Sequence, residues 1–260
     1  MLRRSLAVAL TSVLLVTACS SGESEPSSTT TTPAAKTGFA TVGADEWDEP
    51  QQWRAGDLPV PPEGSSAAQL EQMAGIIDQW SRTALFKPEV LQGKDVVKNV
   101  VASLPPIVQQ RFAQQVADTP GPQLSSGNVF SAKPSGLSRA SSVWKVDMAK
   151  APDGSPAVRL RLQVRAVYPF GDQLIGTIRD FGVTTPAGSA VGEVFGLSGR
   201  WYAYGADPCE LINSDVMAPL ADKAAATKDL GLYSGIVAKP EFQEPEDIDV
   251  RSPEELKDAC

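Results

Sequence analysis

Three arginines recur at alternate positions in one stretch of the chain. Arg159, Arg161 and Arg165 share their parity with Gln163, which fills the gap in the row. Alternate residues of a β-strand point to the same face, so a strand here would space neighbouring side chains of the row about 6–7 Å apart. Guanidinium groups bind phosphate or carboxylate through paired hydrogen bonds, which makes the row a candidate anion-binding face. The alternative is a solvated face with cross-strand ion pairs such as Asp147–Arg159.

Aromatic side chains gather later in the sequence, at Trp201, Tyr202 and Tyr204. On a strand, Trp201 and Tyr202 point to opposite faces, so one packs in the core and the other is available for a sugar or a peptide. The alternative is that these aromatic side chains serve only core and edge packing. We therefore group Trp201 with the arginine row as the possible ligand face. Arg179 and Arg200 would join this face if the sheet encloses a pocket.

Histidine is absent from the chain. Its absence excludes Ser-His-Asp and Cys-His activation of a nucleophile, and no GxxxxGK[ST], GxGxxG or GxSxG motif occurs. A zinc site is not expected from two cysteines without histidine. We expect no enzymatic activity, no metal and no cofactor. Catalysis by paired carboxylates is the remaining alternative, with Asp207 and Glu210 as the nearest cluster.

Cys209 and Cys260 form an even pair once Cys19 is assigned as described below. We predict a disulfide between them, which would close a loop of about 50 residues and stabilise the fold by about 4 kcal/mol in the chain-entropy model. The alternative is two free thiols or a reactive Cys209.

The amino terminus has the pattern of an export signal. Arg3 and Arg4 precede an apolar stretch from Leu6 to Val16, which ends in Val16-Thr17-Ala18-Cys19. A stretch of about 11 residues is too short to cross a membrane as a helix. Its end resembles the lipobox of bacterial lipoproteins, and the resemblance implies cleavage before Cys19 and a diacylglycerol on its sulfur. The alternative is an ordinary signal peptide with a cysteine by chance.

The resemblance to lipoproteins implies a location on the extracytoplasmic face of the cell membrane, because two acyl chains hold a protein there stably. The net charge of −8 argues against binding to nucleic acid and against contact with anionic lipid headgroups. The expected partners are the membrane, through the anchor at Cys19, and an envelope protein or a cell-wall component.

Composition divides the chain into three parts. We assign residues 1–18 to the lipoprotein signal peptide, 19–65 to a Ser/Thr/Pro-rich tether with an extended arm, and 66–260 to the domain with an acidic C-terminal tail. The tether should be disordered as far as about residue 38, because it lacks large apolar side chains. The arm carries Trp47 and Trp53, and either packs on the domain without helix or continues the tether.

Helical periodicity opens the domain. Ser66 and Gln69 fit a capping box, and a helix face follows at three- and four-residue spacing. A second helix is expected from residue 96 to a stop at Pro105, and a third from Pro106 to the breaker at residues 119–122. The apolar positions of the first and third helices are Leu70, Met73, Ile77, Trp80 and Ala84, then Val108, Phe112 and Val116.

The period then changes to two, which predicts a hairpin around the turn Pro152-Asp153-Gly154. Matching the apolar sets places Met148 opposite Val158 and Trp144 opposite Leu162. A third strand is expected at residues 174–184, and a fourth at 192–197 or 200–204. Residues 211–230 are weakly helical, and a last short helix should begin at Ser252.

Helices followed by antiparallel strands predict an α+β fold, with the N-terminal helices packed on one face of a curved antiparallel sheet. The layout of residues 66–210, with Arg200-Trp201-Tyr202 late in the chain, is similar to the cone-shaped fold of the nuclear transport factor superfamily and to actinobacterial lipoproteins that look like it. No active-site residue carries over, since the aspartate–histidine pair of some members cannot exist here.

We expect a non-enzymatic binding or accessory module of the cell envelope. The alternatives are a small-ligand-binding protein with a pocket against the sheet, and an enzyme that uses carboxylates.

Overall fold

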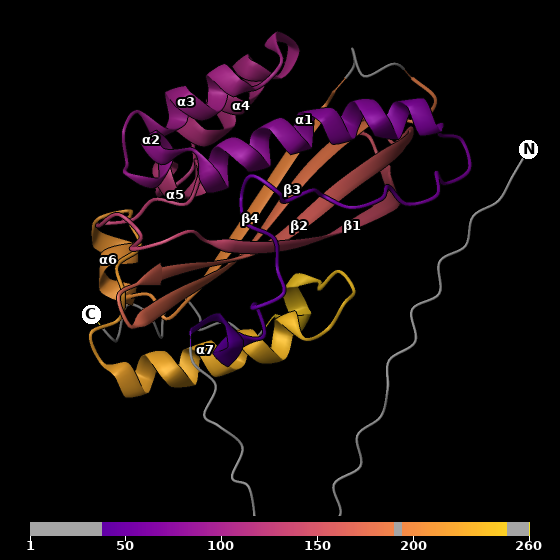
Figure 1. Cartoon of the computed structure of the whole chain (residues 1–260). Helices are drawn as coiled ribbons and strands as arrows, with labels where there is room; N and C mark the ends of the chain where they lie inside the picture. Colours follow the sequence, from indigo (N-terminus) through magenta and orange to yellow (C-terminus); the bar gives the residue numbers. More distant parts are fainter. Residues whose placement is uncertain (1–37, 190–193, 249–259) are drawn as a thin grey trace, which may run out of the picture. The chain divides into compact units, whose positions relative to one another are not determined.

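A four-stranded antiparallel sheet forms the centre of the structure (Figure 1). The computed structural model describes residues 38–189, 194–248 and 260, which belong to one compact unit, Lys36–Cys260. The strands are adjacent in chain order, and their bounds are β1 Arg139–Lys150, β2 Pro156–Phe170, β3 Gln173–Pro186 and β4 Gly196–Tyr204. Helices lie before and after the sheet in the sequence, so the predicted α+β class is confirmed.

The β1–β2 hairpin has the predicted register. Trp144 lies opposite Leu162 and Met148 opposite Val158, and both partners on β2 are fully buried. Alternation fixes this register, because a slip by one residue would turn every apolar side chain to the other face. The turn forms where expected, with the Asp153 carboxylate accepting the Ser155 N–H at 2.9 Å.

The two further strands also form. The third expected strand lies within β3, and β4 is one continuous strand that includes residues from both expected segments. Between residues 211 and 230, where weak helicity is expected, the structure has the end of α6 (Pro208–Asn213) and the start of α7 (Lys223–Val237). The helix expected from Ser252 lies outside the described residues.

Helix α1 (Ala67–Phe86) begins at the predicted cap, where the Ser66 hydroxyl accepts the Gln69 N–H at 3.1 Å. The second half of the capping box is replaced by a tertiary contact. The Gln69 side-chain amide donates instead to the Thr185 hydroxyl and the Pro186 carbonyl oxygen, both at 2.8 Å. The cap thus joins the start of α1 to the end of β3.

Helices α3 (Val96–Ser103) and α4 (Pro106–Ala117) form as expected, with Phe112 among the buried residues of α4. Two short helices were not expected, α2 (Pro88–Leu91) and α5 (Pro122–Ser126). Both begin where a proline suggests a stop. Proline at the first helical position lacks only an N–H that would stay unpaired, so it opens a new helix as readily as it ends one.

Helices α1 to α5 cover one face of the sheet, which we call the helix face (Figure 1). Its core is centred on Trp80, whose ring packs edge-on against Phe112 at 5.1 Å and Phe181 at 5.0 Å between centroids. These contacts join α1, α4 and β3 in one apolar layer.

The opposite face, which we call the α7 face, is covered by α7 and by a short 3₁₀ helix, η1 (Gly38–Val42) (Figure 1). Tyr233 of α7 is fully buried there and lies directly on Gly176 of β3, where a Cβ atom would come within 2.9 Å of its ring. Helices therefore pack on both faces of the sheet. We expected helices, the N-terminal ones, on one face only.

The arm packs on the domain. Trp53 is fully buried, with Phe86 at 5.4 Å between ring centroids and the Arg82 guanidinium 4.9 Å above its ring. Trp47 is half-buried against Tyr233, and Asp48 pairs with Ala140 of β1. The folded unit thus begins before Ser66, and the arm contains a 3₁₀ helix where we expected none.

Candidate functional site

The arginine row (Arg159, Arg161, Gln163 and Arg165) lies on the α7 face, as alternation predicts. Arg159 pairs with Asp147 across the hairpin at 2.7 Å, which confirms the expected ion pair. Arg161 contacts the same carboxylate at 2.9 Å and also binds Glu244 at 2.8 Å. The first half of the row is therefore engaged by carboxylates of the chain itself.

The second half of the row, Gln163 and Arg165, forms hydrogen bonds with a segment near the C-terminus. We call residues 238–248 the C-terminal segment. Arg165 is only 4% exposed and donates to the carbonyl oxygens of Lys239 at 2.5 Å and Glu241 at 2.6 Å. Burial lowers the pKa of this guanidinium. Gln163 binds both the N–H and the carbonyl oxygen of Gln243. Main-chain groups thus supply most of the partners that a ligand would otherwise provide.

Glu244 is the charged residue through which the C-terminal segment binds the sheet. Its carboxylate accepts hydrogen bonds from Arg161 and from Lys145, and the first of these, more than any other contact, lowers the Glu244 pKa to about 2. The ring of Phe242 lies 4.6 Å from the Arg161 guanidinium. In the described residues the arginine row is occupied by the protein's own chain.

Asp180 lies beside the row and is 6% exposed. Its carboxylate accepts from Gln163 at 3.0 Å, and burial raises its pKa to about 6. A pair of carboxyl groups with opposite pKa shifts, such as Asp180 and Glu244, is a pattern of acid–base catalysis. Here the causes are structural, and neither residue lines the three cavities described below.

Trp201 is on the helix face, opposite Arg179 of β3, so the structure does not bring it together with the arginine row. It lines a cleft of about 430 Å³ between α4 and β4, which we call the β4 cleft. The lining residues are Trp80, Phe112, Gln115, Val116, Thr119, Pro120, Ser125, Gly199, Arg200, Trp201 and Tyr202. Arg200 is the single charged side chain in this lining.

The aromatic walls of the β4 cleft come from distant parts of the chain, namely α1, α4 and β4. The buried indole N–H of Trp80 finds no acceptor among the described residues. The indole N–H groups of Trp53 and Trp144, which do not line the cleft, share this property. The lining of the cleft combines apolar walls, a few polar groups and one cation, the usual composition of a binding site.

Arg179 does not enter a pocket with Arg200, because it points to the helix face, where it is 1% exposed. Its guanidinium donates to Asn128 and to the carbonyl oxygens of Leu124, Ser125 and Gly127, near the end of α5. Burial lowers its pKa to about 10, so it stays charged at neutral pH.

The other end of α5 is also capped by a charged group. The Asp215 carboxylate accepts the N–H groups of Gln123 at 2.8 Å and Leu124 at 3.2 Å. A carboxylate at the start of a helix and a cation at its end both complement the helix dipole. Together they fix α5, whose Ser125 lines the β4 cleft.

Two further cavities lie elsewhere in the described residues. One of about 670 Å³ lies between η1, α7 and the β2–β3 turn, with Phe39, Val42, Leu174 and Leu230 in its lining. Another of about 230 Å³ lies near the end of α1.

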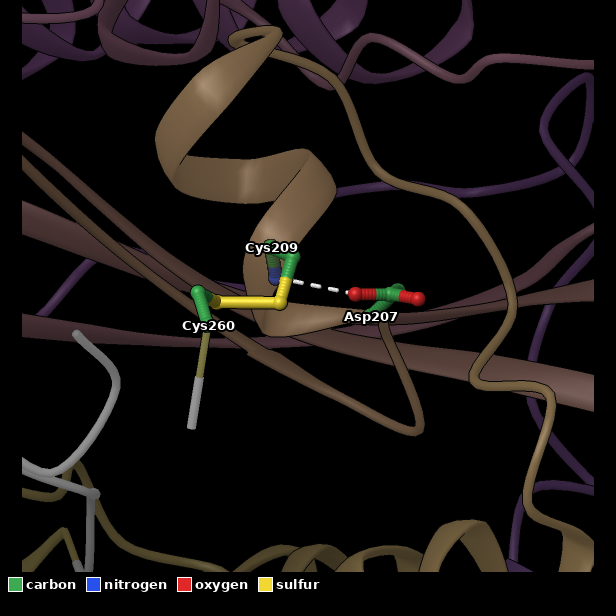
Figure 2. The surroundings of a disulfide bond; sticks show 3 residues. All are labelled: Asp207, Cys209 and Cys260. Atoms are coloured by element: carbon green, nitrogen blue, oxygen red, sulfur yellow. Dashed lines mark hydrogen bonds between the residues drawn. A yellow bond between two sulfur atoms is a disulfide. The ribbon is translucent and has the colours of Figure 1, made fainter. Parts of the chain in front are cut away.

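Cys209 and Cys260 are joined by a disulfide with their Cα atoms 5.3 Å apart (Figure 2), the pairing that the sequence predicts. The carboxylate of Asp207, named above in the nearest acidic cluster, accepts the Cys209 N–H at 2.8 Å and caps α6. The described residues hold no cluster of three or more His, Cys, Asp or Glu able to bind a metal ion. Cys19 and the signal lie outside the described residues.

The comparisons with known proteins give no relative: no family model, no curated protein and no solved structure was found to match this chain. Among the helices of the described residues, none has the length and hydropathy needed to span a membrane.

The sequence pattern indicates Trp201 and Arg200 as candidates but not the cleft that they line. The signal that could have found it is Gly199 next to Arg200-Trp201 on a strand, because glycine inside a strand often marks a close approach by another group.

Proposed function

We propose that this protein is a lipid-anchored, non-enzymatic binding module on the extracytoplasmic face of a bacterial cell membrane. The anchor is supported by the sequence, in which Arg3 and Arg4, the short apolar stretch and the lipobox-like end resemble the signal of lipoproteins, and this resemblance implies a diacylglycerol on Cys19. Two acyl chains give stable attachment without a membrane-spanning helix.

The observation that carries the binding role is the β4 cleft. Its volume of about 430 Å³ falls in the range of about 300–1,000 Å³ typical of ligand sites, and its walls present aromatic rings with one arginine. The arginine row supports this role less well, since the C-terminal segment fills it. The partner that we expect in the cleft is a component of the cell envelope.

The anchor is tested with the variant Cys19→Ala, expressed in the native type of cell. We expect the protein to leave the membrane fraction and to lose incorporation of an alkyne-labelled fatty acid. Continued sedimentation with membranes would contradict the anchor.

The cleft is tested by photo-crosslinking in intact cells. A photoreactive amino acid replaces Gln115, an exposed residue of α4 that lines the cleft, or, as a control, Lys150 at the end of β1. We expect an adduct with an envelope component only from position 115, and its loss in the additional variant Trp201→Ala. No adduct, or equal adducts from both positions, would exclude the cleft as the binding site.

A second candidate function is the binding of a small apolar ligand. It is favoured by the cavity of about 670 Å³ beside η1, where Phe39, Val42, Leu174 and Leu230 supply apolar walls. Native mass spectrometry of protein extracted from its own membranes would reveal a bound lipid or similar molecule. A mass equal to that of the acylated chain alone would exclude this function.

A further inference from the structure

Strand β4 is an open edge of the sheet (Figure 1). It is last in the order β1-β2-β3-β4, and no described strand pairs with its outer side. Ser198, Gly199 and Arg200 are exposed in the middle of the strand. Such an edge presents unpaired N–H and carbonyl groups, which can pair with another extended chain.

Proteins usually protect their edge strands with proline, lysine or a covering segment. The opposite edge, β1, has such protection: Asp48 of the arm pairs with Ala140, and Lys145 and Lys150 lie along the strand. Strand β4 contains neither proline nor lysine. The difference indicates that the β4 edge is left open for a partner.

The β4 cleft runs beside this edge. Its second wall is one face of α4, formed by Phe112, Gln115 and Val116 at helical spacing, together with Thr119 just beyond the end of the helix. A chain paired with the outer edge of β4, about 4.8 Å away, would therefore lie between the strand and α4. In this mode of recognition, main-chain hydrogen bonds give affinity and pockets for alternate side chains give specificity.

We propose that the β4 cleft binds an extended peptide segment of an envelope protein, which adds to the sheet as a fifth strand. This inference rests on the proposed function and names the partner's chemistry. Trp201 and Arg200 point to opposite faces of the sheet, so adjacent residues of the peptide meet different surroundings. The peptide places an apolar or aromatic side chain beside Trp201 and Phe112, and an acidic side chain one position away, beside Arg200.

Charge supports an acidic partner for this site. Arg200 is the single charged residue that lines the cleft, and Arg111 of α4 lies near the start of β4, where it donates to the Val194 carbonyl oxygen at 2.7 Å. The lining of the cleft thus carries one positive charge on a chain whose net charge is −8; Asp180 faces Arg200 from β3 but is not part of the lining. Opposite charges across a small interface select partners and speed association.

The first experiment is a selection of peptides on the full-length protein, with a display library of random octapeptides as the probe. We expect enrichment of sequences that place an apolar residue next to an acidic one. Binding of a selected peptide should fall at least tenfold in the variant Trp201→Ala and remain in the matched control Trp47→Ala. The variant Arg200→Gln, which removes the charge without placing a second carboxyl group opposite Asp180, should also lose at least tenfold. No enrichment, or equal binding to all variants, would overturn the proposal.

The second experiment tests the fifth strand itself. Single amides of a selected peptide are N-methylated in turn, which removes one N–H donor at a time. In a strand, alternate amides face the neighbouring strand, so methylation should reduce binding at least tenfold at every second position and little between. Uniform effects along the peptide would overturn pairing with β4.

The two proposals fail differently. A glycan adduct from position 115 in intact cells, with no peptide selected, leaves the binding function intact and overturns the fifth strand. No adduct at all overturns the function.

Discussion

The Asp180 carboxyl makes the stability of this protein depend on pH in a range where few other groups titrate. The chain has no histidine, and burial raises the Asp180 pKa from its ordinary 3.8 to about 6. Between these two values the folded state binds more protons than the unfolded state. The free energy of unfolding therefore falls as the pH rises through this window.

The magnitude follows from linkage. With a folded pKa of about 6 and an unfolded pKa of 3.8, the group contributes about 1.3 kcal/mol more stability at pH 5 than at pH 7. The variant Asp180→Asn cannot titrate and should lack this gain. Glu244, whose pKa is lowered to about 2, titrates below the range and does not interfere.

Urea denaturation followed by tryptophan fluorescence, at several pH values from 5 to 7, measures this difference. The control is Asp153→Asn, because Asp153 is exposed and hydrogen bonds from Ser155 lower its pKa, away from the range. We expect the free energy of unfolding of the wild type, relative to that of Asp180→Asn, to fall by about 1.3 kcal/mol from pH 5 to pH 7. Relative to that of the control, it should stay constant. If the free energies of unfolding of the wild type and Asp180→Asn change in parallel with pH, the Asp180 pKa is not raised by burial.

Two other predictions concern the α7 face. Glu244→Gln should lower the free energy of unfolding by about 1 kcal/mol at pH 7. Because the Glu244 pKa is lowered to about 2, this difference between the two proteins should disappear as the pH falls from 4.5 toward 2. Denaturation of both proteins at pH 4.5 and near pH 2 checks this. Gly176→Ala should destabilise by about 1–3 kcal/mol, because its Cβ would lie 2.9 Å from the Tyr233 ring. Gly235→Ala on α7, with no atom within 4 Å, should not destabilise in thermal melts, and an equal loss in both variants would contradict the close contact.

The parts of the fold that could be predicted from the sequence are those that a local period specifies. Alternation of apolar and charged residues fixed the register of the hairpin down to the pair Asp147–Arg159. Spacing of three and four placed α1 and α4, and the even cysteine count identified the pair at Cys209 and Cys260.

The parts that could not be predicted depend on contacts between distant segments. Arg165 is buried because it donates to main-chain carbonyl oxygens more than 70 residues away in the sequence. No pattern of side chains along the sequence predicts such a contact. The β4 cleft likewise exists only once α4 and α5 pack beside β4. Proline at positions 88 and 122 is compatible with both a helix stop and a helix start, so α2 and α5 needed tertiary context.

The burial of Arg179 has a consequence for how this protein tolerates its surroundings. Its guanidinium is balanced by carbonyl dipoles and an amide rather than by a carboxylate, and dissolved ions weaken exposed charge pairs far more than buried hydrogen bonds. With a pKa of about 10, it keeps its proton in mildly alkaline media. We propose that the protein lies outside the cytoplasm, where ionic strength can vary. The hydrogen bonds from Arg179 that hold α5 beside the cleft should persist at both low and high salt concentration.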